Sequence, residues 1–472
     1  MAVLVLLSVA QFVIALDYSI VYVALPSIAA DLHLAPADAQ WVVSAYAVLF
    51  AGFLVVGGRI CDRIGARRLF IGAVGAFGLA SAVGGAATGS AVLLAARGGQ
   101  GLCAALLQPA VLGLIGTTFP AGPARSRAVA VWGSVGASGL AAGAILGGLL
   151  TTASWRLTFL LSVPLTAFCA VGAVVRVAPG RDRPAAGRIP VVAAALGTAT
   201  ALTLVLGLTL GADHGWRAPA TLGCLGLATV LGLWFVRNER PGPGALVAPA
   251  LRRTRSLRLG SAAAALYMAS VGSEFYLLTL LLQAAKGYPP VRAGLAFLPL
   301  ALLVTAGSMA AGRAVRRLAP ATVLAAGFGI AAGGLLWLTA SLTGPSYAGL
   351  LPGIVLSGLG HGLIYTSMFI IGTHDVPPEQ QGTAGALVTT AQYLAGAIML
   401  AALTLLLGPA PAAAGFRPAF GLITAAAAAG LVLAVAARRP RRPADDPAGR
   451  RVAGPADGRA AGAPAAAPWS GG

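Results

Sequence analysis

Hydrophobic residues run through this chain in long blocks that are separated by short segments rich in Arg, Pro or Gly. A helix needs about 20 mostly apolar residues to cross a bilayer, and it satisfies its own backbone hydrogen bonds even in lipid. The pattern therefore predicts an all-α polytopic membrane protein with 14 transmembrane helices, at about 2–30, 40–60, 69–89, 91–115, 128–151, 157–177, 190–210, 218–236, 258–283, 293–312, 321–341, 346–372, 382–408 and 417–437.

Composition agrees with this prediction and adds an orientation. Of the 472 residues, 58% are hydrophobic and 10% are charged, which argues against a disordered chain and against a water-soluble domain. The net charge of +19 would fit a nucleic-acid-binding protein, but the basic residues lie in the short connections between blocks. When alternate connections are assigned to opposite sides, 26 Arg and Lys residues fall on one side and five on the other. The positive-inside rule then places both termini in the cytoplasm.

The amino-acid usage and the chain ends give further expectations. Arginine replaces lysine almost everywhere, with Lys286 as the single lysine, which indicates a high-GC genome and, for this chain, a bacterial inner (plasma) membrane. Very little chain precedes the first block, so we expect the natural start to lie upstream of Met1. Residues 438–472 are rich in Arg, Pro, Ala and Gly, and predict a disordered cytoplasmic tail.

Three charged residues are clearly embedded in the predicted spans: Asp17, Arg97 and Glu274. A lone carboxylate at the centre of a bilayer costs about 2.5–3.5 kcal/mol on insertion scales, so each of these residues is a candidate for function. At 1.5 Å per residue, Asp17 lies roughly 22 Å from the cytoplasmic start of its span, and Arg97 roughly 9 Å from the outer start of its own. Both then lie at one level of a core about 30 Å thick, and we expect them to form an ion pair.

The segment GRICDRIGARR, residues 58–68, connects the second and third predicted spans. This segment resembles the loop signature of the major facilitator superfamily. The residues at the glycine, acidic and basic positions of that signature are Gly58, Asp62, Arg63, Gly65, Arg67 and Arg68. Over about residues 5–435 the chain resembles the fourteen-span drug:proton antiporter branch of that family. The resemblance implies that this loop latches the two halves of the transporter together on the cytoplasmic side.

Other segments extend the resemblance. RGGQG, residues 97–101, resembles the family's fourth-span motif, in which the arginine assists proton coupling. WGSVGASGLAAGAILGG, residues 132–148, resembles the fifth-span antiporter motif, with Ala144 in place of the usual proline. LDYSIVYVALP, SWRLTFLLSVP and EQQGTAGALVTTAQYLAGAI also resemble motifs of the branch, with Tyr22 and Ser162 where asparagine is usual.

The glycines of the fifth-span motif recur every three or four residues and share one helix face. Small residues on one face allow close packing against another helix in a membrane. Plain helix packing is the alternative interpretation of a motif that the family associates with antiport. The predicted packing glycines are Gly136, Gly139, Gly143 and Gly147.

The resemblance implies a division into two halves with an inserted helix pair. The predicted parts are 1–185 for the N-terminal six-helix half, 186–240 for the two extra helices, 241–437 for the C-terminal six-helix half, and 438–472 for the tail. Glu274 lies roughly 24 Å into the first span of the second half, so we place it opposite Asp17 across the internal repeat. Two alternatives are open: Glu274 as a binding group for a cationic substrate only, and Asp17 as a structural partner of Arg97 only.

These residues lead to a mechanistic hypothesis in which Asp17, Arg97 and Glu274 couple proton entry to substrate exit by alternating access. Softer candidates share polar or aromatic side chains on embedded helix faces, and a role in packing is the alternative for each of them. The residues that we expect to line the substrate cavity are Tyr18, Tyr22, Gln108, His361, Tyr365 and Gln392.

Several function classes have no sequence signal. The sequence has no phosphate-binding loop with Lys-Ser/Thr, so we expect that transport is not driven by ATP. It has no cluster of His and Cys residues, and we expect no metal, no cofactor and no enzyme activity. The predicted function is proton-driven export of drugs or natural products that are amphipathic and in part cationic. We expect a monomer in the lipid bilayer whose partners are a small molecule and protons, with no nucleic acid. The alternatives are a proton-coupled importer or symporter of a small metabolite, and a membrane-embedded enzyme or sensor.

Overall fold

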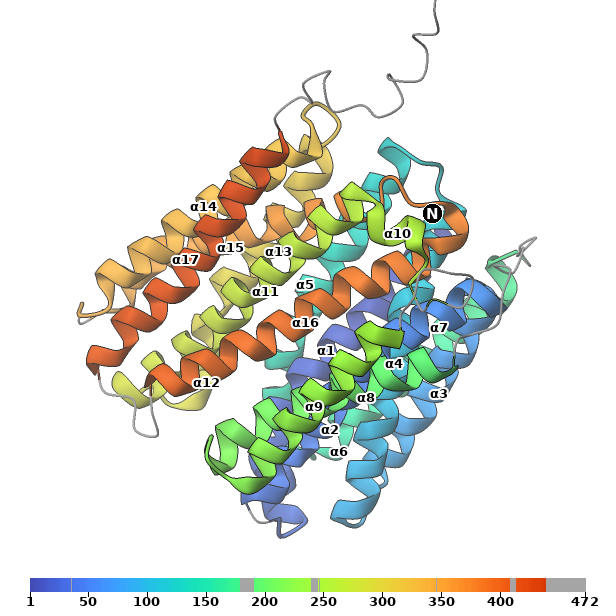
Figure 1. The fold of residues 1–472 in the computed structure, drawn as a ribbon. Helices are drawn as coiled ribbons and strands as arrows, with labels where there is room; N and C mark the ends of the chain where they lie inside the picture. The colour runs from blue at the N-terminus through green and yellow to red at the C-terminus, as the bar shows by residue number, and fades with distance from the viewer. Residues whose placement is uncertain are drawn as a thin grey trace, which may run out of the picture. The chain divides into compact units, whose positions relative to one another are not determined.

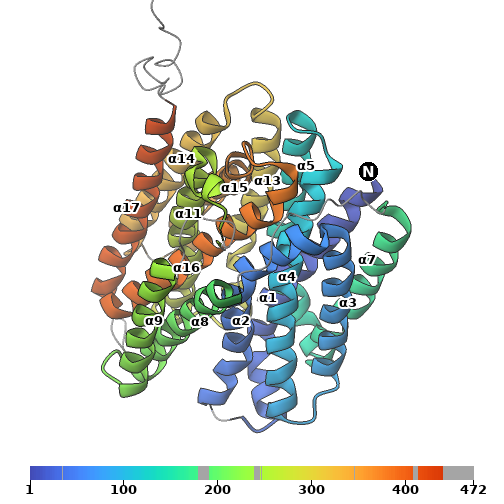
Figure 2. The ribbon, with the colours of Figure 1, turned by 45° about the vertical axis from the view of Figure 1, so that its right-hand side comes forward.

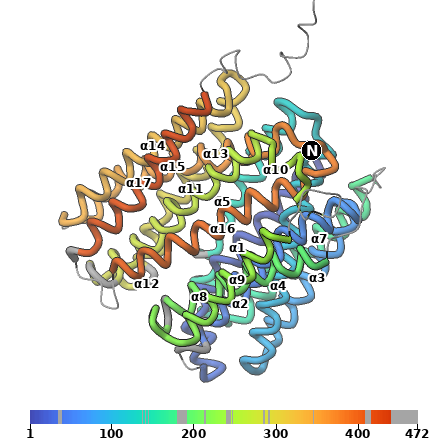
Figure 3. The backbone as a smooth tube through the Cα atoms, in the orientation of Figure 1, coloured from blue at the N-terminus to red at the C-terminus, as the bar shows by residue number. Residues whose placement is uncertain are grey.

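The computed structural model of the chain describes residues 1–34, 36–178, 191–238, 245, 247–344, 346–407 and 413–438. Within this part, Met1–Ala437 forms one compact unit whose regular secondary structure is entirely helical (Figures 1 and 3). The predicted disordered tail lies, apart from Arg438, outside the described residues. So does 239–244, in the basic connection before the second half.

The helices follow the predicted hydrophobic blocks. The first helices along the chain are α1 (Ala2–Asp31), α2 (Pro36–Ile64), α3 (Ala66–Gly85), α4 (Ser90–Thr118), α5 (Pro123–Thr151), α6 (Arg156–Leu160), α7 (Ser162–Arg176), α8 (Val191–His214) and α9 (Pro219–Asn238). They are followed by α10 (Pro249–Arg253), α11 (Arg255–Leu280), the π-helical turn η1 (Leu281–Ala285), α12 (Pro290–Ala296), α13 (Leu298–Ala314), α14 (Pro320–Ser341), α15 (Tyr347–Gly372), the 3₁₀ turn η2 (Pro378–Gln380), α16 (Gln381–Leu407) and α17 (Ala413–Ala437).

The number of long helices agrees with the predicted number of spans. By length and composition, 13 helical segments among the described residues could cross a membrane. The helix α5 adds a further segment of 29 residues. Two predicted spans are each divided by a single residue: 157–177 into α6 and α7, and 293–312 into α12 and α13. Pro164 explains the first break, because a proline ring clashes with the carbonyl group four residues earlier and lacks an N–H group.

The helices pack in two groups. In the first group α1 packs on α5, and α4 packs on α2 and α3. In the second group α15 packs on α13 and α14, and α11 packs on α16 and α17. Figure 1 shows the first group in blue to cyan and the second in yellow to red. The inserted helix α8 contacts α9, α2 and α16, so it touches both groups.

The two groups meet mainly at one end of the unit. This is the end where α1 begins and α17 ends (Figure 2). The distribution of arginines predicts that it faces the cytoplasm. Here α16 crosses α2 and α4, and α13 crosses α5. A Cβ atom on Gly58 of α2 would lie 2.8 Å from the Cβ atom of Ala386 of α16. Nearer mid-membrane, the rings of Phe50 and Tyr393 meet edge to face with centroids 4.8 Å apart. The unit is therefore closed toward the predicted cytoplasmic side.

The glycine face of α5 lies against α1, as the spacing predicts. A Cβ atom on Gly139 would lie 2.8 Å from the carbonyl oxygen of Phe12, and one on Gly147 would lie 3.0 Å from that of Ile20. Gly136 faces the side chain of Gln11 in the same way. The small residues thus bring the backbones of α1 and α5 into direct contact, which fixes the position of α1 in the unit.

Gly143 provides a test of this contact. A Cβ atom there would lie 2.7 Å from the carbonyl oxygen of Leu16, so backbone must move to admit it. We expect Gly143→Ala to lower the free energy of unfolding by about 1–3 kcal/mol, the usual range for overpacking. Gly148→Ala is the matched control, because nothing lies within 4 Å of its Cβ position. Denaturant titration of both purified variants checks the prediction, and equal stability of the two would contradict it.

Candidate functional site

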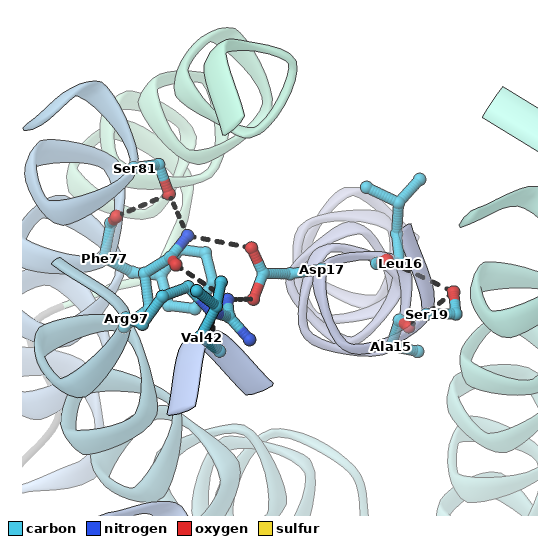
Figure 4. A network of polar contacts seen from close by, with 9 residues as sticks. Ala15, Leu16, Asp17, Ser19, Val42, Phe77, Ser81 and Arg97 are labelled. Carbon is cyan, nitrogen blue, oxygen red and sulfur yellow. Dashed lines mark hydrogen bonds and ion pairs between the residues drawn. The ribbon is translucent and has the colours of Figure 1, made fainter. Parts of the chain in front are cut away.

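Asp17 of α1 forms a buried ion pair with Arg97 of α4. Arg97 Nη1 donates to Asp17 Oδ2 at 2.7 Å, and Arg97 Nε donates to the carbonyl oxygen of Val42 on α2 at 2.8 Å (Figure 4). Asp17 is 0% exposed and Arg97 is 1% exposed. The contact predicted from the depths of the two residues is therefore present. A buried charge is tolerated when it is paired and hydrogen-bonded, and both conditions hold here.

The ion pair belongs to a larger network that sequence reasoning missed. Gln100 Nε2 donates to Asp17 Oδ1 at 2.8 Å and to Ser81 Oγ at 2.9 Å. Gln100 Oε1 accepts from Arg97 Nη1 at 2.8 Å. The guanidinium also lies 4.6 Å from the centre of the Tyr46 ring, within range of a cation–π contact. Gln100 could have been found from its spacing, since residues three apart on a helix share a face.

Glu274 of α11 lies in a second buried cluster, with His361 of α15. Ser357 Oγ donates to Glu274 Oε1 at 2.6 Å, and Glu274 Oε2 lies 3.3 Å from His361 Nδ1. His361 Nε2 lies 3.1 Å from Ser270 Oγ, which donates to the carbonyl oxygen of Tyr267 at 2.8 Å. Glu274 and His361 are both 0% exposed. The second group of helices therefore also buries a carboxylate beside a basic side chain.

Helical spacing explains how these four side chains meet. Ser270 and Glu274 are four residues apart on α11, and Ser357 and His361 are four residues apart on α15, so each pair shares a helix face. Each serine bonds to the ionisable residue of the other helix, as expected where two helices pack antiparallel. We expected His361 in the cavity lining, but its full burial makes it a partner of Glu274, because a buried imidazole needs polar contacts.

The other predicted cavity residues lie outside the hydrogen bonds of both clusters, and they differ in exposure. Tyr22 is 50% exposed, and its ring lies 5.6 Å from that of Tyr18. Tyr365 stacks on Trp132 of α5, with centroids 5.9 Å apart. The remaining two are buried: Gln392 Nε2 lies 3.8 Å from Met268 Sδ, and Gln108 is 3% exposed.

A separate apolar pocket of about 400 Å³ lies between α1 and α5. Its lining includes Leu4, Phe12 and Val135. None of the six predicted cavity residues lines it. Among the described residues, no group of three or more His, Cys, Asp or Glu side chains could hold a metal ion.

The predicted loop latch contacts the N-terminal end of α16. Thr383 Oγ1 donates to Asp62 Oδ2, and the N–H group of Thr383 donates to Asp62 Oδ1 at 3.3 Å. Gly65 has φ +91°, a left-handed conformation that favours glycine. Arg67 Nε donates to the carbonyl oxygen of Val177 at 2.7 Å. Thus the contact between the two groups comes from Asp62, and Arg67 ties α3 to the end of α7.

Other members of the loop motif differ in their environment. Gly58 is buried against α16, whereas the side chains of Arg63 and Arg68 are exposed. The exposed arginines lie at the predicted cytoplasmic surface, where the positive-inside rule expects basic residues. The structure therefore separates the motif into an inward glycine and acid and an outward basic edge.

Opening of the latch can be followed at Cys61, which is 3% exposed beside Asp62. A hydrogen bond to a charged group contributes about 1.5–3 kcal/mol, so we expect Asp62→Asn to raise the alkylation rate of Cys61 by about tenfold or more. The measurement uses a chain in which the other three cysteines are serine. Asp375→Asn is the control, because Asp375 is an exposed carboxylate that bonds to His374. Equal rates in the two variants would contradict a latching role.

The opposite end of the first group is held by the SWRLTF segment. Asp31, the last residue of α1, accepts from Trp155 Nε1 at 3.0 Å and from Arg156 Nη1 at 2.8 Å. Arg156 Nη2 also donates to the carbonyl oxygen of Ala87 at 3.2 Å, beyond the end of α3. The motif therefore joins the ends of α1, α3 and α6. It supports the helices that carry the Asp17 network and lies outside that network.

Comparison with known proteins gives one family and consistent relatives. Residues 7–191 and 187–400 match the family described as Major Facilitator Superfamily. The chain is 36% identical over 428 residues to the cephamycin export protein CmcT of Amycolatopsis lactamdurans, covering 88% of each chain. It is 36% identical to the puromycin resistance protein pur8 of Streptomyces alboniger, covering 85% of this chain and 80% of that one. The fold is similar to that of the human organic anion transporter MFSD10 (TETRAN), with TM-score 0.64, 16% identity, and coverage of 92% and 99%.

Proposed function

The chain belongs to the major facilitator superfamily and is a multi-pass membrane transporter, and we propose that it drives the export of drugs or natural products with protons. Relatives that align over most of the chain are an export protein and a resistance protein. They favour export over import of a metabolite. We propose amphipathic substrates, cations among them, because each of the two clusters combines a buried acid with an aromatic ring: Tyr46 lies beside Arg97, and Tyr267 lies beside His361.

The observation that carries the proton coupling is a buried carboxylate beside a basic side chain in each group of helices. These are Asp17 with Arg97 and Glu274 with His361. A carboxylate that gains or loses a proton changes the charge at its site, and such a change biases a two-state protein toward one conformation. We therefore assign coupling to Asp17, Arg97 and Glu274, and no cofactor enters the cycle.

Alternating access supplies the conformational step. The unit as described is closed toward the predicted cytoplasmic side, where Asp62 bonds to Thr383. Loading of substrate from the cytoplasm requires that this contact break while the outer ends approach. We propose that the parts 1–185 and 241–437 move against one another as a monomer, with both termini cytoplasmic. The substrate would meet Tyr18, Tyr22 and Tyr365.

Export can be tested in a susceptible bacterial host that expresses the full chain. Puromycin and ethidium serve as probes, and their accumulation in energised cells is compared with that in cells carrying an empty vector. We expect lower accumulation of at least one probe, and we expect a protonophore to abolish the difference. Higher accumulation in expressing cells, or a difference that survives the protonophore, would contradict proton-driven export.

A further inference from the structure

We propose that the pocket between α1 and α5 binds an anionic phospholipid of the cytoplasmic leaflet, with the lipid phosphate on Arg127 and an acyl chain between the two helices. This site goes beyond the proposed export, because none of the residues in the two acid clusters lines the pocket. Its volume is about 400 Å³, and ligand pockets typically measure about 300–1,000 Å³. The pocket is therefore large enough to hold part of a lipid, while the rest of the lipid stays in the bilayer.

The glycine contact between α1 and α5 explains where the pocket lies. Gly136 faces Gln11 and Gly147 faces Ile20, so both helices run in the same direction, from the predicted cytoplasmic side outward. On the cytoplasmic side of Gly136, the α5 residue that borders the pocket is Val131 and not a glycine. The close backbone contact ends there, and the pocket extends from this level toward the cytoplasmic ends of both helices.

The lining of the pocket changes in character with depth. Arg127 lies eight residues before Val135 on α5, which is roughly 12 Å closer to the cytoplasm. Ser8 lies four residues before Phe12 on α1, which is roughly 6 Å closer. The pocket thus presents a cation first, then a hydroxyl group, and then apolar side chains. A phospholipid has the matching order of a phosphate, ester carbonyl groups and acyl chains.

Arg127 is available to a ligand. Its side chain is exposed, and it forms no hydrogen bond or ion pair with another described residue. The neighbouring Arg125 differs, since its Nη2 atom donates to the carbonyl oxygen of Gly116 at 2.8 Å. A guanidinium group binds a phosphate through two parallel hydrogen bonds, and the cytoplasmic leaflet carries anionic lipids. Charge complementarity therefore favours an anionic headgroup at this pocket over a cationic one.

Ser8 indicates that the ligand has a polar atom inside the pocket. Ser8 is 6% exposed, and its Oγ atom has no hydrogen-bond partner among the described residues. The buried Ser81, by contrast, donates to the carbonyl oxygen of Phe77 at 2.8 Å. A buried hydroxyl group without a partner lowers stability, and an ester carbonyl oxygen of a lipid would accept its hydrogen. A pocket that takes only acyl chains needs no such group.

The pocket reaches the surface of the unit. Val5, which lines it, is 51% exposed, and Figure 2 shows the beginning of α1 at the edge of the unit. This end of the unit is predicted to face the cytoplasm, so it lies level with the headgroups of the cytoplasmic leaflet. A lipid can therefore enter sideways from the bilayer, without passing the Asp17 or Glu274 clusters.

A bound lipid would extend the contact between α1 and α5 to their cytoplasmic ends. A ligand that binds only the folded protein raises its stability by mass action. We therefore expect phosphatidylglycerol to raise the midpoint of thermal unfolding of the purified chain in detergent. Phosphatidylcholine with the same acyl chains should raise it less, and Arg127→Gln should lose that difference.

Native mass spectrometry of the full chain in detergent measures lipid binding directly. We expect one phosphatidylglycerol to bind at least about fivefold more tightly than phosphatidylcholine, since an arginine beside an anionic lipid contributes about this factor. Arg127→Gln should abolish the preference, and Ser8→Ala should weaken the binding of both lipids. Val135→Trp fills the inner end of the pocket and should remove the tight site. Arg316→Gln is the matched control, because Arg316 is exposed on the same predicted side and does not line the pocket.

The proposal is overturned by equal affinity for the two lipids in the wild type, by unchanged preference in Arg127→Gln, by unchanged affinity in Ser8→Ala, or by an equal loss in Arg316→Gln. A tight site that survives in Val135→Trp places the lipid elsewhere and also overturns it. Arg127 and Arg316 are exposed, so both of these variants should fold, and a melting curve without lipid checks this. Neither measurement involves transport. Lipid preference without export contradicts only the proposed function, and export without lipid preference contradicts only this site.

Discussion

In proteoliposomes with an imposed pH gradient, Glu274→Gln is expected to equilibrate ethidium across the membrane but not to concentrate it. The amide has the size of the acid and keeps the bond from Ser357, whose hydroxyl lies 2.6 Å from Glu274 Oε1. It cannot take up or release a proton. The conformational cycle can then proceed with substrate while the gradient no longer drives it. Uphill accumulation should fall to the level of empty liposomes, and downhill exchange should persist.

Ser273→Ala is the control for this experiment, because it removes a buried hydroxyl from the neighbouring position of α11. It should concentrate ethidium as the wild type does. If Glu274→Gln also concentrates the probe, then Glu274 is not a coupling residue. If Glu274→Gln loses exchange as well as accumulation while Ser273→Ala keeps both, then the carboxyl group is needed for the conformational cycle itself, and a role limited to coupling is contradicted.

Arg97→Gln should have the second large effect, on stability. It leaves the fully buried Asp17 without its cation and leaves the carbonyl oxygen of Val42 without its donor. Removing one partner of a buried ion pair costs about 3–5 kcal/mol. We expect a loss of that size in the free energy of unfolding, measured by denaturant titration in detergent micelles.

A double-mutant cycle identifies the cause of that loss. Adding Asp17→Asn to Arg97→Gln removes the uncompensated charge, so the double variant should be more stable than Arg97→Gln alone. Arg68→Gln, at an exposed arginine, is the control and should change stability little. An Arg97→Gln variant as stable as the control would mean that the ion pair contributes nothing to the fold.

Much of the architecture follows from hydropathy alone. A span must be long and apolar, so the fourteen blocks locate the helices to within a few residues at most ends. Depth counting also placed Asp17 beside Arg97, because a rise of 1.5 Å per residue converts sequence position into level. Pro164 could have predicted the break between α6 and α7. The prediction treated this segment as one helix, because the residues around Pro164 are mostly apolar.

The partners of Glu274 were not predicted, for a physical reason. A charge at a given depth has several neighbouring helices at the same level, and the rotation of each helix is decided by packing. Ser357 and Ser270 bond across α11 and α15 because those helices are antiparallel neighbours. The spacing of four residues within each helix was visible, but the pairing of the two helices was not. The same limit concealed Thr383 as the partner of Asp62.

The two groups of helices thus solve the same burial problem in different ways. One surrounds the Asp17 carboxylate with donors from arginine and glutamine, and a serine bonds to that glutamine. The other uses histidine and two serines, which can satisfy a carboxyl group with or without its proton.

The direct test of proton-driven export is the sign of proton movement when substrate moves. The wild-type chain is reconstituted in liposomes that contain a pH-sensitive dye, with equal pH on both sides, and ethidium is added outside. Entry of ethidium in exchange for protons should make the lumen alkaline, and Glu274→Gln should abolish that signal. Acidification of the lumen, or ethidium entry with no change in pH, would contradict proton antiport.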